Sequence, residues 1–404
     1  MDYFFSTGMA PLSGTATREI FKYLSRPEIV SFAGGLPASD CLPSAQIQEI
    51  CAEIFADPAQ ATRCLQYGTT EGYPELKEQI RALVENEGIH GAGLDTILIA
   101  SGGSQALDLA VKCLINPGDV VLVEDPTFLG FLATVQSYSA RPVGVKADDS
   151  GLVLEDLEEK IKKYKAKLLY TVPNFSNPTG KTYTLENRKA IVSLALKYNM
   201  VVVEDDPYGR LRFAGEKIPP IKSFDDRGIV LYVSSFSKTI SPGLRLGYAH
   251  GHPDLIRKMT IAKQGNDLHT SNLVQLIVKT YLEKGYFYSN IEKSLPIYRE
   301  RETAMIDAIR QYMPREFKHT NPDGGLFIWG EFNAPLNTAQ IFREAIDRNV
   351  AYIDGSSFYG EGESPEGPRG LNTLRLNYTN ETLDRIKTGI QSLGELFSEK
   401  IAAL

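Results

Sequence analysis

Short apolar runs alternate with amphipathic segments through the middle of the chain. Seven runs rich in Val, Ile and Leu predict strands at 96–100, 119–124, 141–145, 167–172, 200–204, 229–234 and 245–249. They lack the strict alternation of a half-buried strand, so we expect them to be buried on both faces of a sheet. Helical periodicity predicts helices at 104–115, 185–198, 253–263 and 286–311. The pattern indicates an α/β fold, with a mostly parallel seven-stranded sheet sandwiched by helices.

The regular alternation of predicted strands and helices ends in the C-terminal part of the chain. Strand-like segments at 326–332, 351–353 and 373–377 and helical segments at 338–348 and 381–397 do not alternate regularly, and a Gly/Pro/Glu-rich stretch at 360–370 predicts a surface loop. We therefore expect a large domain at 45–290. A smaller α+β domain would combine 291–404 with an N-terminal crossing segment at 1–44.

Composition narrows the class of protein. The 404 residues carry 43 Lys+Arg against 50 Asp+Glu, a net charge of −7, so no surface that binds nucleic acid is expected. The four cysteines, at 41, 51, 64 and 113, form no C-x-x-C pair, which argues against a metal site and a disulfide framework. The sequence has no run of 18 apolar residues that could span a membrane, and its N-terminus does not resemble a signal peptide. We expect a soluble, cytoplasmic protein.

The first predicted strand is followed by a possible anion site. Ligands of open parallel sheets bind beyond the carboxyl ends of the strands. Here that end carries Ser101-Gly102-Gly103-Ser104-Gln105, and then a helix begins. Unpaired amides, hydroxyls and the helix dipole would favour an anion, although an ordinary helix cap by Ser101 or Ser104 fits the same sequence.

Reactive side chains follow three further strands. Asp205 and Tyr208 come after 200–204, and Asn177 lies in a turn after 167–172. Lys238 follows 229–234, flanked by small hydroxyl residues, where desolvation and a cationic neighbour would make its amine nucleophilic. Each feature alone fits a cap, a turn or a surface lysine. Together, an anion cradle, an amine, a carboxylate, a phenol and an amide match the needs of pyridoxal 5′-phosphate.

The run Ser235-Phe236-Ser237-Lys238, with Pro242, Gly243 and Arg245 after it, is a highly specific motif. With the other motifs in order, the chain resembles the fold-type I pyridoxal-phosphate-dependent aminotransferases of class I/II over nearly its whole length. Within them it is most similar to the branch that contains 2-aminoadipate and aromatic aminotransferases and the aminotransferase-like domain of MocR-type regulators.

The resemblance implies roles for the residues around the cofactor. Lys238 would form the Schiff base with pyridoxal 5′-phosphate and act as catalytic acid and base, and Asp205 would pair with the pyridine nitrogen. Tyr208 and Asn177 would hold the phenolic oxygen, and Phe128 would stack on the ring where relatives often have Tyr. The phosphate would be held by Gly103, Ser104, Gln105, Ser235, Ser237 and Arg245.

The resemblance also implies how substrates and a second subunit take part. Arg375 would grip the α-carboxylate of amino acid and 2-oxo acid substrates, supported by Asn177, Asn174 and the Gly35 backbone. Tyr67 would reach the phosphate of a neighbouring subunit, which implies a homodimer with shared active sites. Arg18 would help to recognise acidic side chains, although a surface ion pair accounts for it nearly as well.

Other functions fit less well. The segment 177–181 ends like a phosphate-binding loop, but Phe175 stands where that motif needs glycine, and no G-x-G-x-x-G follows a strand. Five histidines give only one H-x-H, so no metal site is expected, and G-x-S-x-G is absent. A ligand-sensing regulator would need a DNA-binding module before residue 20. A β-lyase or decarboxylase on the same scaffold remains open, because the cofactor site would look the same.

Overall fold

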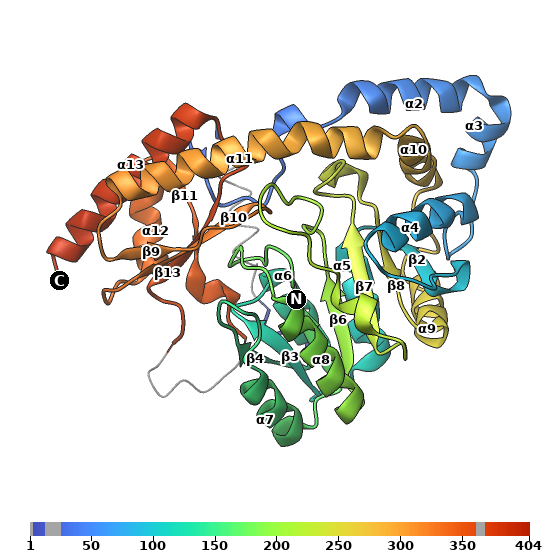
Figure 1. Ribbon diagram of the computed structural model, residues 1–404, viewed down its shortest axis with the longest axis horizontal. Coiled ribbons are helices and arrows are strands. Elements are labelled where there is room, and N and C mark those ends of the chain that lie inside the picture. The colour runs from blue at the N-terminus through green and yellow to red at the C-terminus, as the bar shows by residue number, and fades with distance from the viewer. Residues whose placement is uncertain (1–2, 13–25, 361–367) are drawn as a thin grey trace.

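The computed structural model describes residues 3–12, 26–360 and 368–404 (Figure 1). A seven-stranded sheet has the order β2-β8-β7-β6-β5-β3-β4. Each strand begins and ends within two residues of its predicted bounds. All neighbours are parallel except β8, which runs antiparallel to both β2 and β7. The strands are β2 (Ile97–Ala100), β3 (Val120–Asp125), β4 (Arg141–Lys146), β5 (Leu168–Thr171), β6 (Val201–Asp205), β7 (Val230–Ser235) and β8 (Gly247–His250).

Helices cover both faces of this sheet, as the non-alternating strands predicted. Successive side chains of β2 point to opposite faces: Leu98 packs into one hydrophobic cluster and Ile99 into another. The first face is covered by α5 (Gly103–Leu114), α6 (Leu129–Ser137) and α9 (Pro253–Gln264). The other is covered by α4 (Pro74–Asn86), α7 (Leu154–Tyr164), α8 (Leu185–Tyr198) and α10 (Asn272–Glu283).

A second, antiparallel sheet lies in the C-terminal part, with the order β12-β13-β10-β9. The expected strand at 351–353 is divided between β11 and β12, and β9 was not predicted. The strands are β9 (Phe317–His319), β10 (Phe327–Phe332), β11 (Val350–Ala351), β12 (Ile353–Asp354) and β13 (Thr373–Asn377). The helices beside them are α11 (Tyr286–Tyr312), α12 (Thr338–Asp347) and α13 (Leu383–Ala402).

The N-terminal segment joins this second sheet region rather than the seven-stranded sheet. β1 (Val30–Ser31) pairs in parallel with β11, and the backbone amide of Asn377 donates to the carbonyl of Phe32 at 2.7 Å. The long helix α11 extends from the seven-stranded sheet region to α13, which packs against it (Figure 1). Segments from both chain ends therefore lie together beside the carboxyl ends of the parallel strands.

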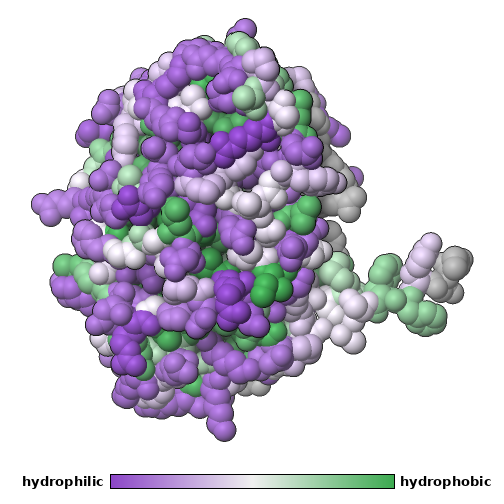
Figure 2. Space-filling model, turned by 90° about the vertical axis from the view of Figure 1, so that its right-hand side faces the viewer, coloured by the Kyte–Doolittle hydropathy of each residue, from purple (hydrophilic) through white to green (hydrophobic). Residues whose placement is uncertain are grey.

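Shorter elements connect these layers. The helices α2 (Ser44–Ala56) and α3 (Pro58–Leu65) precede α4, and five 3₁₀ turns lie at Ser39–Cys41, Leu94–Thr96, Ile221–Phe224, Pro242–Leu244 and Gly355–Phe358. Within the described ranges, none of the helices is long and apolar enough to cross a membrane. Figure 2 shows a surface that is mostly hydrophilic, with a projecting arm that carries hydrophobic residues. The N-terminal Phe4 is 100% exposed.

Candidate active site

A cavity of about 290 Å³ lies where the parallel strands end and the second sheet begins. Loops after β2, β6 and β7 form its floor, and residues of β10, β12 and β13 form its opposite wall. Most of the predicted site residues line it: Gly35, Gly103, Ser104, Phe128, Asn177, Asp205, Tyr208, Ser235, Ser237, Lys238, Arg245 and Arg375. The sequence therefore identified side chains that the fold brings together from distant segments.

Lys238 presents an amine to this cavity from the turn that follows β7. Its Nζ donates to the carbonyl oxygen of Gly35 at 2.5 Å. Among the described residues, no carboxylate forms an ion pair with it. The pKa of Lys238 is lowered to about 8, mainly by desolvation, with the positive charges of Arg375 and Arg245 acting in the same direction. The amine is thus partly neutral near pH 7, as a nucleophile must be.

Asp205, at the end of β6, supplies a buried carboxylate. It accepts a hydrogen bond from the hydroxyl of Tyr170 at 2.8 Å. The pKa of Asp205 is raised to about 7: burial is the largest cause, the Tyr170 hydrogen bond opposes it, and the charge of Asp206 acts in the same direction as burial. Asp206 itself turns away from the cavity, because its carboxylate accepts from the Tyr232 hydroxyl and the Asn174 amide, both at 3.0 Å. A cationic group in the cavity would therefore be stabilised by Asp205.

The start of α5 forms an anion cradle. Gly102 precedes the helix with φ of +87°, and no side chain of the described residues caps its first amides. This φ strains any residue with a side chain, so glycine is favoured there, and its lack of a Cβ leaves room for the Arg245 guanidinium. The hydroxyls of Ser235 and Ser237 are 2.9 Å apart, and Arg245 approaches Ser237 at 3.5 Å. Open amides, two hydroxyls and an exposed guanidinium suit a phosphate.

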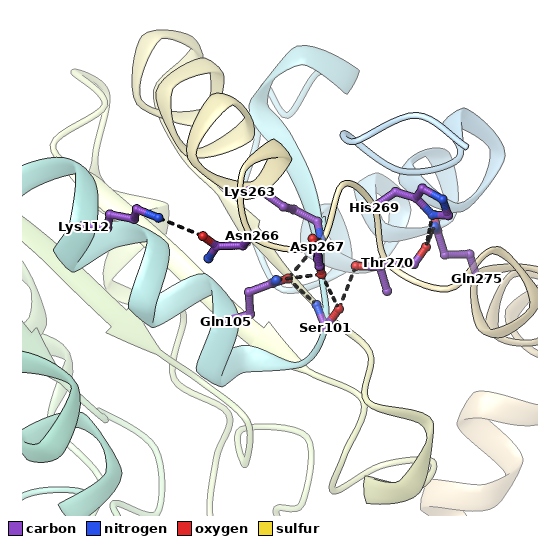
Figure 3. Close-up of polar contacts among 9 residues, drawn as sticks. All are labelled: Ser101, Gln105, Lys112, Lys263, Asn266, Asp267, His269, Thr270 and Gln275. Carbon is purple, nitrogen blue, oxygen red and sulfur yellow. Dashed lines mark hydrogen bonds and ion pairs between the residues drawn. The ribbon is translucent and has the colours of Figure 1, made fainter. Parts of the chain in front are cut away.

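Two predicted residues have their side chains elsewhere. The Gln105 carboxamide accepts from the backbone amide of Ser101 at 2.8 Å and donates to Asp267 at 2.7 Å, behind the loop (Figure 3). The Asn174 carboxamide accepts from Arg188 at 2.6 Å and donates to Asp206. Neither residue lines the cavity. The side chains of Gln105 and Asn174 therefore lie outside the cavity. That Gln105 holds the phosphate and that Asn174 supports substrate binding stay predictions.

Arg375, in the middle of β13, is a buried cation with hydrogen-bonding capacity to spare. It donates to Asn177 Oδ1 at 2.7 Å and to the carbonyl of Ala33 at 2.5 Å, and it stacks 4.2 Å from the Phe327 ring. Its Nε is buried without a partner in the described part of the chain. Desolvation lowers the pKa of Arg375 to about 10, which leaves it cationic at pH 7. A carboxylate bound in the cavity would complete its hydrogen bonds.

Aromatic residues shape the rest of the cavity wall. Tyr208 is buried and meets Phe327 edge to face, with 5.8 Å between ring centroids. Burial raises the pKa of Tyr208, with the charge of Asp205 as the next cause, so its hydroxyl stays protonated. Phe128, just before α6, also lines the cavity. Sequence reasoning missed Phe327 and Tyr170. Tyr170 is the one aromatic residue of β5, whereas Phe327 is one of three aromatic residues in β10 and carries no distinct signal.

The two remaining predicted residues lie apart from the cavity or outside the described ranges. Tyr67 is 79% exposed and meets the His269 ring edge to face, with 5.9 Å between centroids. It does not line the cavity of its own chain. Arg18 lies outside the described residues.

An amine, a buried carboxylate and an anion cradle at the strand ends define a pyridoxal-phosphate-dependent enzyme of fold type I. The chain belongs to the family of aminotransferases class I and II, whose model matches residues 33–392. It is therefore a pyridoxal-phosphate-dependent aminotransferase that moves an amino group between amino acid and 2-oxo acid substrates. The β-lyase and decarboxylase alternative is not favoured.

Named relatives cover almost the whole chain. An aromatic-amino-acid aminotransferase of Thermococcus litoralis is 37% identical, over 99% of this chain and 96% of the relative. A 2-aminoadipate transaminase of Thermus thermophilus is 36% identical, over 98% and 97%. The solved structure of an alpha-aminoadipate aminotransferase from Thermus thermophilus, complexed with N-(5′-phosphopyridoxyl)-L-leucine, matches with a TM-score of 0.90. It is 34% identical and covers 99% of this chain and 98% of that one.

Proposed function

We propose that Lys238 is the catalytic residue that binds the cofactor and moves the proton. When bound, pyridoxal 5′-phosphate withdraws electrons from the substrate bond that loses its proton. Lys238 Nζ accepts the proton from the substrate α-carbon and returns it. The observation that carries this proposal is the pair of Lys238, with its pKa lowered to about 8, and buried Asp205 in one cavity that also contains an anion cradle.

The other cavity residues orient the cofactor and exclude water. Asp205 keeps the proton on the pyridine nitrogen, because a desolvated carboxylate gains most from a cationic partner. The Tyr208 hydroxyl and the Asn177 amide hold the phenolic oxygen, and Phe128 stacks on the ring. The phosphate is held by the amides of Gly103 and Ser104 and by Ser235, Ser237 and Arg245. These side chains already converge on the cavity, so little ordering accompanies binding.

Arg375 binds the α-carboxylate of every substrate, with Asn177 and the Gly35 backbone beside it. The donors include aromatic amino acids and 2-aminoadipate, and the acceptor is a 2-oxo acid such as 2-oxoglutarate. The names of the two relatives support this range. The apolar wall, with Phe128, Leu107 and Phe327, suits a large side chain. Arg18 recognises the acidic donors.

The protein acts as a homodimer whose active sites are shared through Tyr67. An aromatic side chain that is 79% exposed beside Leu65, which is 74% exposed, supports a partner on this surface. The division into a large domain at 45–290 and a small domain at 1–44 and 291–404 stays a proposal, supported by the two separate sheets. A cytoplasmic location and the absence of nucleic-acid binding are also proposed, on the four free cysteines and the net charge of −7.

A donor screen tests the substrate range. The wild type, Arg18→Ala and the control Arg310→Ala, which removes an exposed arginine, are assayed for keto-acid formation from acidic, aromatic and small neutral amino acids. Wild type is expected to accept aromatic and acidic donors, and only Arg18→Ala should lose the acidic ones. Equal losses for all donors would make Arg18 structural. Turnover of small neutral donors alone would refute the proposed range.

A further inference from the structure

A buried ammonium group lies behind the anion cradle and outside the cavity. The Lys263 side chain, near the end of α9, has an exposed fraction of 0%. Its Nζ donates to Asp267 Oδ1 at 2.6 Å, to Asp267 Oδ2 at 2.8 Å and to Gln105 Oε1 at 3.0 Å. An ammonium has three protons, so each has an acceptor. A buried charge is costly even when it is paired, which calls for an account of its presence.

The same ion pair fastens both ends of the loop from Ser101 to Gln105. Asp267 Oδ2 also accepts from Gln105 Nε2 at 2.7 Å and from the Ser101 hydroxyl at 3.0 Å. Gln105 Oε1 accepts in turn from the backbone amide of Ser101 at 2.8 Å. Figure 3 shows these contacts converging on the carboxylate of Asp267. Between the two fastened ends lie Gly102 and Gly103, which have no side chains to fix their own conformation.

Further contacts attach the segment after α9 to Ser101 and to the last turn of α5. The Thr270 hydroxyl lies 3.2 Å from the Ser101 hydroxyl, and Lys112, two turns further along α5, donates to Asn266 Oδ1 at 2.8 Å (Figure 3). The segment from 263 to 270 is thus bonded both to the residues at the start of α5 and to its last turn. This gives the loop a support that is independent of the cavity.

We propose that Lys263 and Asp267 are positioning residues for the cofactor phosphate. They act through Gln105 and Ser101, and hold the loop so that the first amides of α5 point into the cavity. The inference rests on the proposed function, in which this loop binds the phosphate. A loop that is already ordered binds an anion without the entropy cost of ordering. The Gln105 side chain supports the loop on the side away from the cavity and does not contact the phosphate.

A positioning role and a purely electrostatic role predict different changes in phosphate binding when Lys263 and Asp267 are replaced singly. Lys263→Met removes a positive charge and Asp267→Ala a negative one, so a purely electrostatic role would weaken phosphate binding in the first variant and strengthen it in the second. A positioning role weakens it in both, because each variant releases the Gln105 side chain. The double variant Lys263→Met/Asp267→Ala leaves the net charge unchanged and removes only the support.

The experiment titrates the full chain, freed of cofactor, with pyridoxal 5′-phosphate and separately with pyridoxal. The dissociation constant of pyridoxal divided by that of pyridoxal 5′-phosphate isolates the contribution of the phosphate, and this ratio falls when phosphate binding weakens. Each single variant and the double variant should reduce this ratio roughly tenfold, the effect of one to two lost hydrogen bonds. Pyridoxal binding should stay within about twofold of wild type, because it does not use the cradle. Lys263→Arg, which keeps the charge and donors, should recover part of the ratio.

A matched control separates this effect from a general loss of structure. Lys222→Met removes another buried ammonium, whose side chain is 8% exposed and which pairs with Asp225 at 2.9 Å. It should leave the ratio unchanged. If Asp267→Ala does not fold because it strands the Lys263 charge, the double variant carries the test.

The outcomes distinguish this inference from the proposed function. An unchanged ratio in the double variant, opposite signs in the two single variants, or an equal loss of pyridoxal binding would each overturn the inference. Arg245→Ala tests the cradle itself. If Arg245→Ala keeps the ratio, the proposed phosphate site is wrong. If Arg245→Ala lowers it while the Lys263 and Asp267 variants do not, only the positioning role fails.

Discussion

Replacing Arg375 with lysine tests the proposed substrate grip most directly. The guanidinium donates to Asn177 and to the Ala33 carbonyl and stacks on Phe327, and its buried Nε has no partner among the residues that the structure describes. Two parallel donors can therefore meet a substrate carboxylate. Lysine offers one compact ammonium on a flexible stem, and it cannot serve Asn177, Ala33 and a carboxylate with the same geometry.

The expected loss follows from the bonds removed. Losing one charge-assisted hydrogen bond in a desolvated site costs about 1.5–3 kcal/mol, or roughly ten- to hundredfold in kcat/KM. The loss should be similar for acidic, aromatic and neutral donors, because all carry the same α-carboxylate. Burial that lowers the pKa of Arg375 to about 10 would also lower that of a lysine, so KM of Arg375→Lys should rise with pH more steeply than in wild type.

The assay is the single-turnover half-reaction, followed by cofactor absorbance, with three donor classes and Arg310→Lys as the surface control. The spectrum of the resting enzyme should be unchanged, because Arg375 would contact substrate and not cofactor. A loss confined to acidic donors would refute the reasoning, since Arg375 would then bind the side chain. A weaker affinity for cofactor would refute it as well.

The other predictions concern the cofactor side of the site. Asp205→Ala should weaken cofactor binding and slow proton removal more severely, measured at saturating cofactor; an unchanged rate would refute the role of Asp205. Mixing Tyr67→Phe chains with Lys238→Ala chains should partly restore activity if sites are shared, whereas activity that only tracks the Tyr67→Phe homodimer would assign each site to one subunit. With a pKa of about 8, Lys238 is neutral at pH 7 about 300 times more often than an ordinary lysine. The rate of cofactor loading should therefore rise from pH 6, reach half its maximum near pH 8 and level off above about pH 9. A rate that still climbs at pH 10 would contradict this pKa. In the cofactor-free protein, the unfolded chain then holds more protons than the folded one above pH 8, so this group's contribution to the free energy of unfolding rises with pH there.

The sequence predicted the seven strands well because most of them are rich in aliphatic residues and are buried on both faces. The direction of β8 was not predicted, since Gly247–His250 has the same apolar pattern in either orientation. Only the short connection from β7, too short for a helical crossover, distinguishes the two cases. The helix α6 was missed because its sequence, Leu129–Ser137, is apolar on most sides and lacks a clear 3.6-residue period.

The sequence did not predict the side-chain directions at the site. Gln105 lies in the expected loop, but its orientation depends on Asp267, which is 162 residues away in the sequence. Asn174 likewise bonds Arg188 and Asp206, which a linear pattern does not connect. Positions fixed by strand ends were therefore predictable, whereas rotamers fixed by distant partners were not.

The crossing segment lies between the two sheets in the cavity wall and forms hydrogen bonds with residues of both. Val30 and Ser31 pair with β11, the Phe32 carbonyl accepts from Asn377, and the Ala33 carbonyl accepts from Arg375, so these residues travel with the second sheet. Lys238 belongs to the seven-stranded sheet and meets this segment at the Gly35 carbonyl. If the two sheets rotated relative to one another, Arg375 and Gly35 would therefore move together. The distance from Lys238 Nζ to the Gly35 carbonyl oxygen would then measure the extent of that rotation.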